Sequence, residues 1–310
     1  MVSKVPGAGI LLMLMLVLFT LANPRFVSQS NLTNVGLQTA LLLMIALPMT
    51  LIILTEGLDL SAGALLGLSG VIVAEALLAG WGVAAACAAG LVASLAFGVM
   101  NGWLIAYLAL PAFVVTLGTM GLMQGIALVM TNGDPVGGFT PAIEAFYRSH
   151  VLLIPTPIAI AVMLYAALWL LLYRTRFGNY VIATGGNKEA LRLAGIPANL
   201  VHLAVYVLGS ATIGLSAVLL IGRTNSAHPT VGVGMEFEAI AAVVLGGTSF
   251  EKGQGWLFGA VLGALAITVL RNGLNILSVD SSLQVVCIGM LLILALMIDQ
   301  GRKRFTRRTT

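Results

Sequence analysis

The sequence predicts an all-α protein: a polytopic transmembrane helical bundle of about ten spans, forming a single domain over residues 1–310. Of its 310 residues, 59% are hydrophobic and only 8% are charged, and the mean hydropathy is +1.06. A soluble domain carries about 25% charged residues, which help to cover its surface. The 36 glycines are a second indication, since small side chains let helices approach closely in lipid. We therefore expect a bilayer to surround most of the chain.

Ten apolar segments define the expected spans. A hydrocarbon core about 30 Å thick requires about 20 apolar residues of helix. The segments lie at 7–22, 35–55, 60–80, 82–107, 111–131, 151–173, 200–222, 236–250, 256–278 and 282–299. Those at 60–80 and 236–250 are interrupted or flanked by glycines and carboxylates. We expect broken or re-entrant helices there, enclosed by protein or lining a cavity.

The basic residues orient these spans. With the N-terminus in the cytoplasm and ten crossings, only four of the 15 Lys and Arg residues fall near the outer side. The four are Arg25, Arg148, Arg223 and Arg271. This asymmetry follows the positive-inside rule and places both termini in the cytoplasm. Basic residues at span ends, without interleaved aromatic side chains, argue against nucleic acid as a partner.

The longest polar stretch is the expected cytoplasmic loop 174–199. Asn187 is a good N-cap for a short helix over 188–194, and Gly195 ends it. A short amphipathic helix between two spans suits docking to a soluble partner, with Leu191 among its apolar anchors. A solvated loop that merely orients the neighbouring spans is an equally weighted alternative.

Longer stretches of the chain resemble the ribose-type branch of bacterial ABC importer permeases. They are LTEGLDLSAGALLGLSG (54–70), PAFVVTLGTMGLMQGIALVMTNG (111–133), AIAAVVLGGTSFEKGQGWLFGAVLGAL (239–265) and RNGLNIL (271–277). In addition, Glu189-Ala190 followed by Gly195 is similar to the EAA-x-x-x-G coupling loop of those permeases, with Leu191 in place of the second alanine. The likeness therefore covers nearly the whole chain.

The resemblance implies the membrane subunit of an importer for a monosaccharide, autoinducer-2 or a related small polyhydroxylated solute in the bacterial inner membrane. Transport would proceed by alternating access. The implied partners are cytoplasmic ATPase subunits, a periplasmic or extracellular solute-binding protein, and a second permease copy or a homologous permease. The ATPase-facing residues would be Asn187, Lys188, Glu189, Ala190, Leu191, Arg192 and Gly195. Because the chain lacks a G-x-x-x-x-G-K-[ST] loop, ATP and Mg²⁺ would be used by the ATPase subunits, and we expect this chain to bind no cofactor.

Polar side chains within spans are candidates for the solute path, since a hydroxyl-rich solute needs amide and hydroxyl partners. They are Asn101, Thr116, Thr119, Gln124, Asn272, Asn275 and Gln284. The alternative for each is a hydrogen bond between helices. The expected outer loop holds candidates for contact with the binding protein, or is a plain solvated loop. Those candidates are Arg223, His228, Glu236 and Glu238. The three histidines are scattered and predict no metal site.

Carboxylates near the span ends are compatible with a second function. Glu56 and Asp59 lie near the expected cytoplasmic surface, where water would reach them. Capping of the next helix by Asp59 and Ser61 is the preferred interpretation, although intramembrane carboxylates are often functional. An ion-coupled secondary transporter using Glu56, Asp59 or Glu75 is therefore the alternative. A membrane enzyme is disfavoured, because neither an H-E-x-x-H nor a G-x-S-x-G motif is present.

Overall fold

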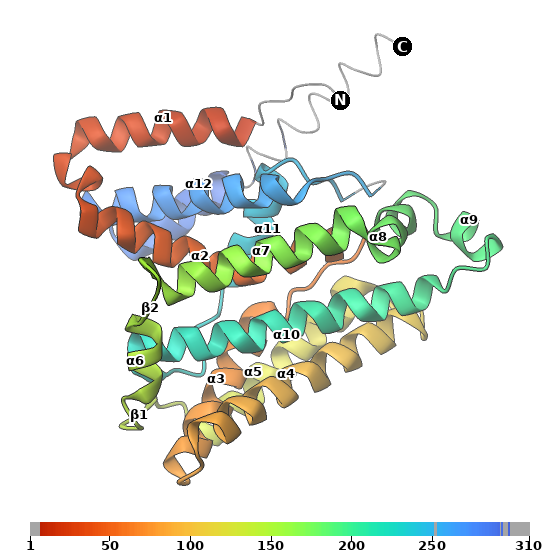
Figure 1. The fold of residues 1–310 in the computed structure, drawn as a ribbon, viewed down its shortest axis with the longest axis horizontal. Helices are drawn as coiled ribbons and strands as arrows, with labels where there is room; N and C mark the ends of the chain where they lie inside the picture. The colour runs from red at the N-terminus through yellow and green to blue at the C-terminus, as the bar shows by residue number, and fades with distance from the viewer. Residues whose placement is uncertain (1–6, 251–252, 292, 294–296, 298–310) are drawn as a thin grey trace.

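The computed structural model describes residues 7–250, 253–291, 293 and 297, which form a helical bundle (Figure 1). Within these residues, six helices are long and apolar enough to cross a membrane. They are α2 (Gln29–Leu54), α4 (Val83–Ala106), α5 (Ala112–Thr131), α7 (Thr156–Arg174), α10 (Ala198–Thr224) and α12 (Leu257–Ile276). The expected polytopic helical fold is confirmed.

Shorter elements complete the bundle. The apolar ones are α1 (Gly7–Ala22), α3 (Ala62–Leu78), α11 (Met235–Leu245) and a final helix over Ser281–Leu291. The others are η1 (Pro24–Val27), α6 (Ala142–Arg148), α8 (Arg176–Gly186) and α9 (Lys188–Leu193). Two antiparallel pairs of short strands join β1 (Val136–Gly137) to β4 (Ser226–Ala227) and β2 (His150–Val151) to β3 (Ile154–Pro155).

Every predicted apolar segment contains a helix, but the two interrupted ones are short. The segment 60–80 gives α3, with 17 residues, and 236–250 gives α11, with 11 residues. At 1.5 Å per residue α11 is about 16 Å long, roughly half the thickness of the hydrocarbon core. It therefore cannot cross a membrane alone. Most of the predicted segment 282–299 beyond residue 291 lies outside the described residues.

The short elements collect at two opposite ends of the bundle (Figure 1). One end carries α6, β1 and β2, and we call it the α6 end; the other carries α8 and α9, and we call it the α9 end. Between them, α2 is buried from Thr39 to Leu54 and packs against α7, α10, α11 and α12. In contrast, only 8 of the 24 residues of α4 are buried. The core therefore surrounds α2, while α4 lies at the periphery of the bundle.

Candidate functional site

Helix α9 is the short helix predicted within the loop 174–199. The Asn187 Oδ1 atom accepts a hydrogen bond from the Ala190 N–H at 2.9 Å, as expected of an N-cap. Gly195 has φ of +74°, and the Ile196 N–H donates to the Leu191 carbonyl at 3.1 Å. This is the Schellman arrangement that ends helices at a left-handed glycine. The predicted start and end of the helix are confirmed.

The exposed surface of α9 differs from the expected one at Leu191. Leu191 is only 7% exposed and packs into the protein, so it anchors the helix to its own chain rather than to a partner. Leu193 is 81% exposed. The charged side chains around it are free to solvent, and Glu189 pairs with Arg192 across 3.8 Å. The helix therefore exposes one leucine surrounded by charged side chains.

Helix α8 precedes α9 and was not predicted as a helix. Gly185 and Gly186 are its last residues. Gly185 is buried, and a Cβ added there would collide with the carbonyl of Leu54 at the end of α2 and lie 2.9 Å from Cα of Gly253. Because this close approach requires glycine, α8 packs tightly on the bundle. Helix α8 thus connects the short helix α9 to the bundle.

A buried polar cluster lies at the break between α2 and α3. Asp59 is only 4% exposed, and its Oδ1 atom accepts hydrogen bonds from the Ser61 backbone N–H at 2.9 Å and the Ser61 hydroxyl at 2.5 Å. Ser61 is the N-cap residue of α3, but its side chain makes no cap hydrogen bond. Two expectations are therefore wrong. Asp59 does not lie in water, and the Ser61 hydroxyl serves Asp59 instead of the helix.

Two neighbouring helices hold this break from the side. The Asn101 Nδ2 amide of α4 donates to the Ser61 hydroxyl at 3.0 Å. The Thr116 hydroxyl of α5 lies within hydrogen-bonding distance of two carbonyls, those of Leu58 at 3.2 Å and Ala112 at 2.9 Å. Since Thr116 is four residues into α5, the cluster lies about 6 Å from that end of the helix. Asn101 and Thr116, two of the residues predicted for the solute path, thus both contact the break between α2 and α3.

Helix α10 holds the break from a third side. The Tyr206 hydroxyl donates to the Leu58 carbonyl at 3.1 Å, and His202 Nε2 donates to the Thr55 carbonyl at 2.8 Å. Neither residue was predicted as a site residue. The sequence did contain a signal, since a histidine and a tyrosine lie one turn apart near the start of an apolar span. Buried polar side chains need hydrogen-bond partners, so these two residues indicate a polar contact inside the protein.

The start of α11 meets the start of α3. A Cβ added at Gly63 would collide with the carbonyl of Gly232 and with Oε2 of Glu236. One turn farther along α3, a Cβ at Gly67 would lie 2.7 Å from the Pro229 carbonyl oxygen. The segment before α11 therefore runs along a glycine face of α3. The two interrupted spans touch inside the protein.

Glu236 was predicted at the outer surface, yet it is only 2% exposed. Its carboxylate accepts the Gly234 N–H at 3.1 and 3.2 Å, directly before α11. Glu238 is half-buried and pairs with Arg271 at 2.6 Å. The structure thus places both carboxylates away from the exposed surface predicted for them. Of the four docking candidates, Arg223 and His228 are exposed.

The remaining path candidates are dispersed. Thr119 donates to the Thr116 carbonyl at 3.2 Å and lies beside the cluster. Asn272 exchanges two hydrogen bonds of 2.9 Å with Asn31, which agrees with the interhelical alternative. Gln124 is half-buried, Asn275 is exposed, and Gln284 donates to the Val279 carbonyl at 2.8 Å. Among the described residues, no group of three or more His, Cys, Asp or Glu side chains could hold a metal ion.

Known proteins are similar to this chain in sequence. The family model described as branched-chain amino acid transport system / permease component matches residues 31–296. The ribose import permease protein of Escherichia coli (strain K12) is 38% identical over 298 residues, covering 95% of this chain and 93% of that protein. The D-allose transport system permease protein of the same strain is 35% identical over 296 residues, covering 95% and 91%.

A solved structure shows the same fold. It is described as an inward-facing conformation of a putative metal-chelate type ABC transporter, with a TM-score of 0.52, 12% identity and 98% of each chain covered. The relatives are permease components, in agreement with the expectation of a transport subunit without its own ATPase site. The chain is thus a multi-pass membrane protein that belongs to the permease family of ABC importers, on the branch that includes the ribose and allose permeases.

Proposed function

We propose that this permease moves a monosaccharide or a related small polyhydroxylated solute across the bacterial inner membrane by alternating access. The ribose and D-allose named for its relatives support a sugar. Hydroxyl-rich solutes also suit the amide and hydroxyl groups of the cluster, where Asn101, Thr116 and Thr119 remain our candidates for the path. The other four candidates now require direct testing, since they lie apart from the cluster. The whole chain would act as one transmembrane domain.

The α9 end would face the cytoplasm, together with both termini. There the exposed charges and Leu193 of α9 would bind ATPase subunits, which use ATP and Mg²⁺, while this chain binds no cofactor. At the α6 end, His228 is exposed on the segment that follows β4 and would contact the solute-binding protein. A second permease copy or a homologous permease would complete the pore at the subunit interface.

The observation that carries this proposal is the connection between α9 and the buried break. Only Gly195 to Pro197 separate the end of α9 and its cap from α10. The first turns of α10 carry His202 and Tyr206, which hold the backbone of residues 55–58. A rigid-body displacement of α9 would therefore move the α2–α3 break through α10. This gives the ATPase a mechanical route to the interior of the membrane domain.

Uptake into proteoliposomes tests the proposal. The permease is reconstituted with its ATPase and binding protein, and accumulation of radiolabelled D-ribose and D-allose is followed. We expect accumulation that requires ATP inside the vesicles and does not respond to an imposed proton or sodium gradient. Uptake driven by either gradient without ATP would instead support the ion-coupled alternative.

A further inference from the structure

An ion pair joins the interrupted helix α11 to the membrane-spanning helix α12. The Arg271 Nη1 atom of α12 lies 2.6 Å from the Glu238 Oε1 atom of α11. The other ion pairs among the described residues belong to the short helices α6 and α9, at the two ends of the bundle. Glu238 is half-buried, whereas the Arg271 side chain is 44% exposed. One side of this pair therefore faces away from the rest of the described chain.

The residues around the start of α12 mark one boundary of the membrane. The Leu257 N–H, at the first residue of α12, donates to the Tyr173 hydroxyl at 3.0 Å. Next to Tyr173, the Arg174 guanidinium lies 5.6 Å from the centroid of the Trp169 ring. Tryptophan, tyrosine and arginine are typical of the boundary between hydrocarbon and headgroups. The boundary at the α9 end thus lies close to the start of α12.

The antiparallel packing of α11 on α12 gives the depth of Glu238. A Cβ added at Gly246 would collide with the Gly259 carbonyl, and one added at Gly263 would collide with the Ala242 carbonyl. Continuing this register, Glu238 is level with a point about 10 residues into α12, which is about 15 Å from its start. That distance is half of a hydrocarbon core about 30 Å thick. Glu238 therefore lies near the middle of the membrane.

The Arg271 guanidinium does not extend toward a membrane surface. In the same register, Arg271 lies one turn nearer the α6 end than Glu238, and its side chain reaches back toward the middle of the membrane to form the pair. Arginines that contact headgroups extend toward the surface instead. Charged side chains at this depth are costly in hydrocarbon, so they face other protein or a water-filled cavity. The exposed side of the pair therefore borders water or a second chain.

The surroundings of the pair are those of a solute site. Helix α11 begins at Met235, one turn before Glu238, and solute sites of transporters commonly lie near the midplane where an interrupted helix begins. Asn275 lies one turn beyond Arg271 on the same face of α12. It is exposed and is one of the candidates for the solute path. A carboxylate, a guanidinium and an amide thus occur together on these two helices.

We infer that the Glu238–Arg271 pair lines a water-filled solute path and binds hydroxyl groups of the solute near the middle of the membrane. The inference rests on the proposed function, because it takes the solute to be polyhydroxylated. A sugar hydroxyl both donates and accepts hydrogen bonds, so it can contact the carboxylate and the guanidinium together. Hydrogen bonds to charged groups are stronger than those between neutral groups. Since the two charges of the pair balance, a neutral solute binds there without leaving a net charge in the membrane.

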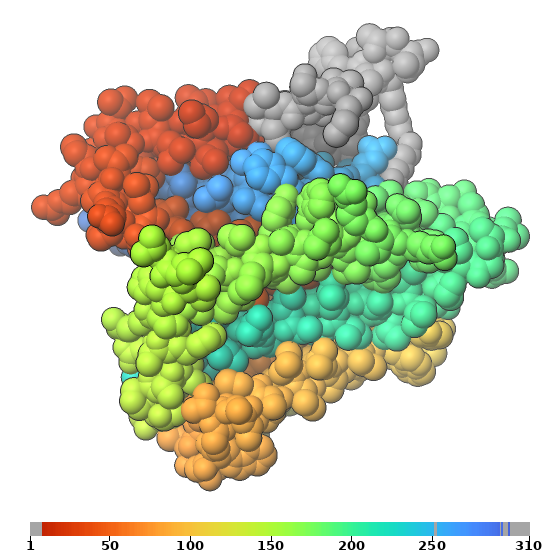
Figure 2. All heavy atoms as spheres, in the orientation of Figure 1, coloured from red at the N-terminus to blue at the C-terminus, as the bar shows by residue number. Residues whose placement is uncertain are grey.

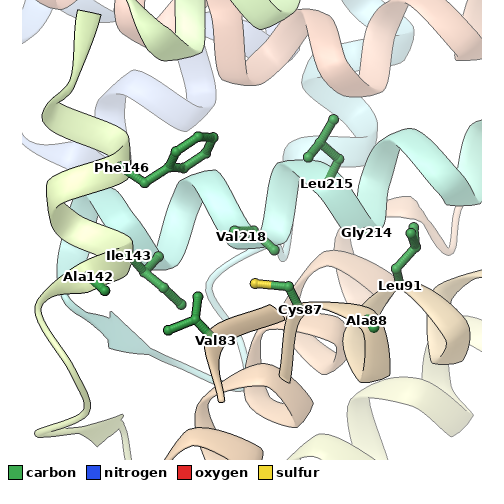
Figure 3. A pocket seen from close by; sticks show the side chains of 10 residues that line it. All are labelled: Val83, Cys87, Ala88, Leu91, Ala142, Ile143, Phe146, Gly214, Leu215 and Val218. Atoms are coloured by element: carbon green, nitrogen blue, oxygen red, sulfur yellow. The ribbon is translucent and has the colours of Figure 1, made fainter. Parts of the chain in front are cut away.

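Thiol modification tests whether water reaches the pair. Cys287 and Cys87, which lines an apolar pocket between α4, α6 and α10 (Figure 3), are first replaced by alanine. Arg271→Cys is then combined with Glu238→Gln, so that no carboxylate is left unpaired. We expect a charged, water-soluble methanethiosulfonate to modify this cysteine in proteoliposomes, because the reactive species is the thiolate, which forms in water.

Val17→Cys in α1 is the matched control at the same depth. Helices α1 and α12 run in the same direction (Figure 1), and a Cβ added at Gly273 would collide with the Phe19 ring, so Val17 is level with Arg271. Val17 is exposed, and α1 forms one edge of the molecule (Figure 2). We expect this cysteine to stay unmodified, because a thiolate does not form in hydrocarbon. An unmodified Arg271→Cys would mean that a second chain covers the pair, and this result or equal rates at both positions would overturn the inference.

A neutral pair tests solute binding. Glu238→Gln with Arg271→Gln keeps two hydrogen-bonding side chains and removes both charges, and replacing a whole buried ion pair is often neutral for stability. We expect ATP-driven D-ribose uptake to fall about tenfold, the difference between charged and neutral hydrogen bonds, at an unchanged melting temperature. Arg271→Lys keeps the charge and should retain more uptake than the neutral pair. Arg25→Gln, at an exposed arginine of η1, controls for the loss of one positive charge.

The outcomes separate this inference from the proposed function. If the wild-type permease takes up neither D-ribose nor D-allose, the proposed function fails, whereas water access to Arg271→Cys is measured without any solute. If the wild type takes up D-ribose and the neutral pair does so as fast as Arg25→Gln, the proposed function stands and the inference is wrong.

Discussion

The contact between α3 and the segment before α11 predicts the effect of one added methyl group. In Gly67→Ala the new Cβ would lie 2.7 Å from the Pro229 carbonyl oxygen, whereas ordinary contacts of this kind begin at 3.4 Å. A backbone carbonyl cannot rotate away as a flexible side chain can, so α3 and the segment must separate. Overpacking of this kind costs about 1–3 kcal/mol. Alanine also gains up to about 1 kcal/mol over glycine through its helix propensity.

Gly118→Ala provides the matched control, because Gly118 is also in the interior of an apolar helix and no atom lies within 4 Å of its added Cβ. The propensity gain is common to both variants, so the difference between them reports packing alone. Thermal unfolding of the purified variants in detergent should place Gly67→Ala at least about 2 °C below Gly118→Ala. Equal melting temperatures would mean that the segment does not lie on α3, and the described meeting of the two interrupted spans would be wrong.

Three further variants test the proposed coupling route. Gly195→Val places a β-branched side chain at φ of +74°, which is strained; binding-protein stimulation of ATP hydrolysis should fall while membrane insertion, followed by fractionation, persists. Tyr206→Phe removes the hydrogen bond to Leu58, at a cost of about 1 kcal/mol, and should lower coupled uptake more than Tyr165→Phe in α7; equal uptake would exclude α10 as the route. Asp59→Asn keeps an acceptor for both Ser61 donors and should retain ATP-driven uptake in proteoliposomes; complete loss with normal folding would support ion coupling.

Local signals in the sequence predicted the ends of α9 correctly. One side chain, Asn187, satisfies the helix start, and one residue able to adopt positive φ, Gly195, ends it. Neither feature depends on the rest of the fold. The direction of Leu191 was not predictable in the same way, because α9 is a short helix whose buried face is decided by its packing on α8 and α10.

The burial of Asp59 could not be predicted from its neighbours in the sequence. Its surroundings are completed by Asn101, 40 residues away from Ser61, and by Tyr206, 148 residues away from Leu58. The apolar pattern predicts that these helices exist and how long they are. It does not predict which polar side chains contact the break between two helices. The same reason applies to Glu236. An outer loop was predicted from charge, whereas the chain turns inward along the glycine face of α3.

The two buried carboxylates have a common structural role that accounts for them without ion coupling. Each lies at the start of an interrupted helix: Asp59 accepts the Ser61 N–H before α3, and Glu236 accepts the Gly234 N–H before α11. A helix that begins inside a membrane leaves backbone N–H groups without water, and each unsatisfied group costs several kcal/mol. A carboxylate there supplies acceptors and opposes the positive end of the helix dipole. Acidic residues at the starts of the broken helices thus have a structural role, so the presence of these acids inside the protein does not by itself indicate a transported proton or sodium ion.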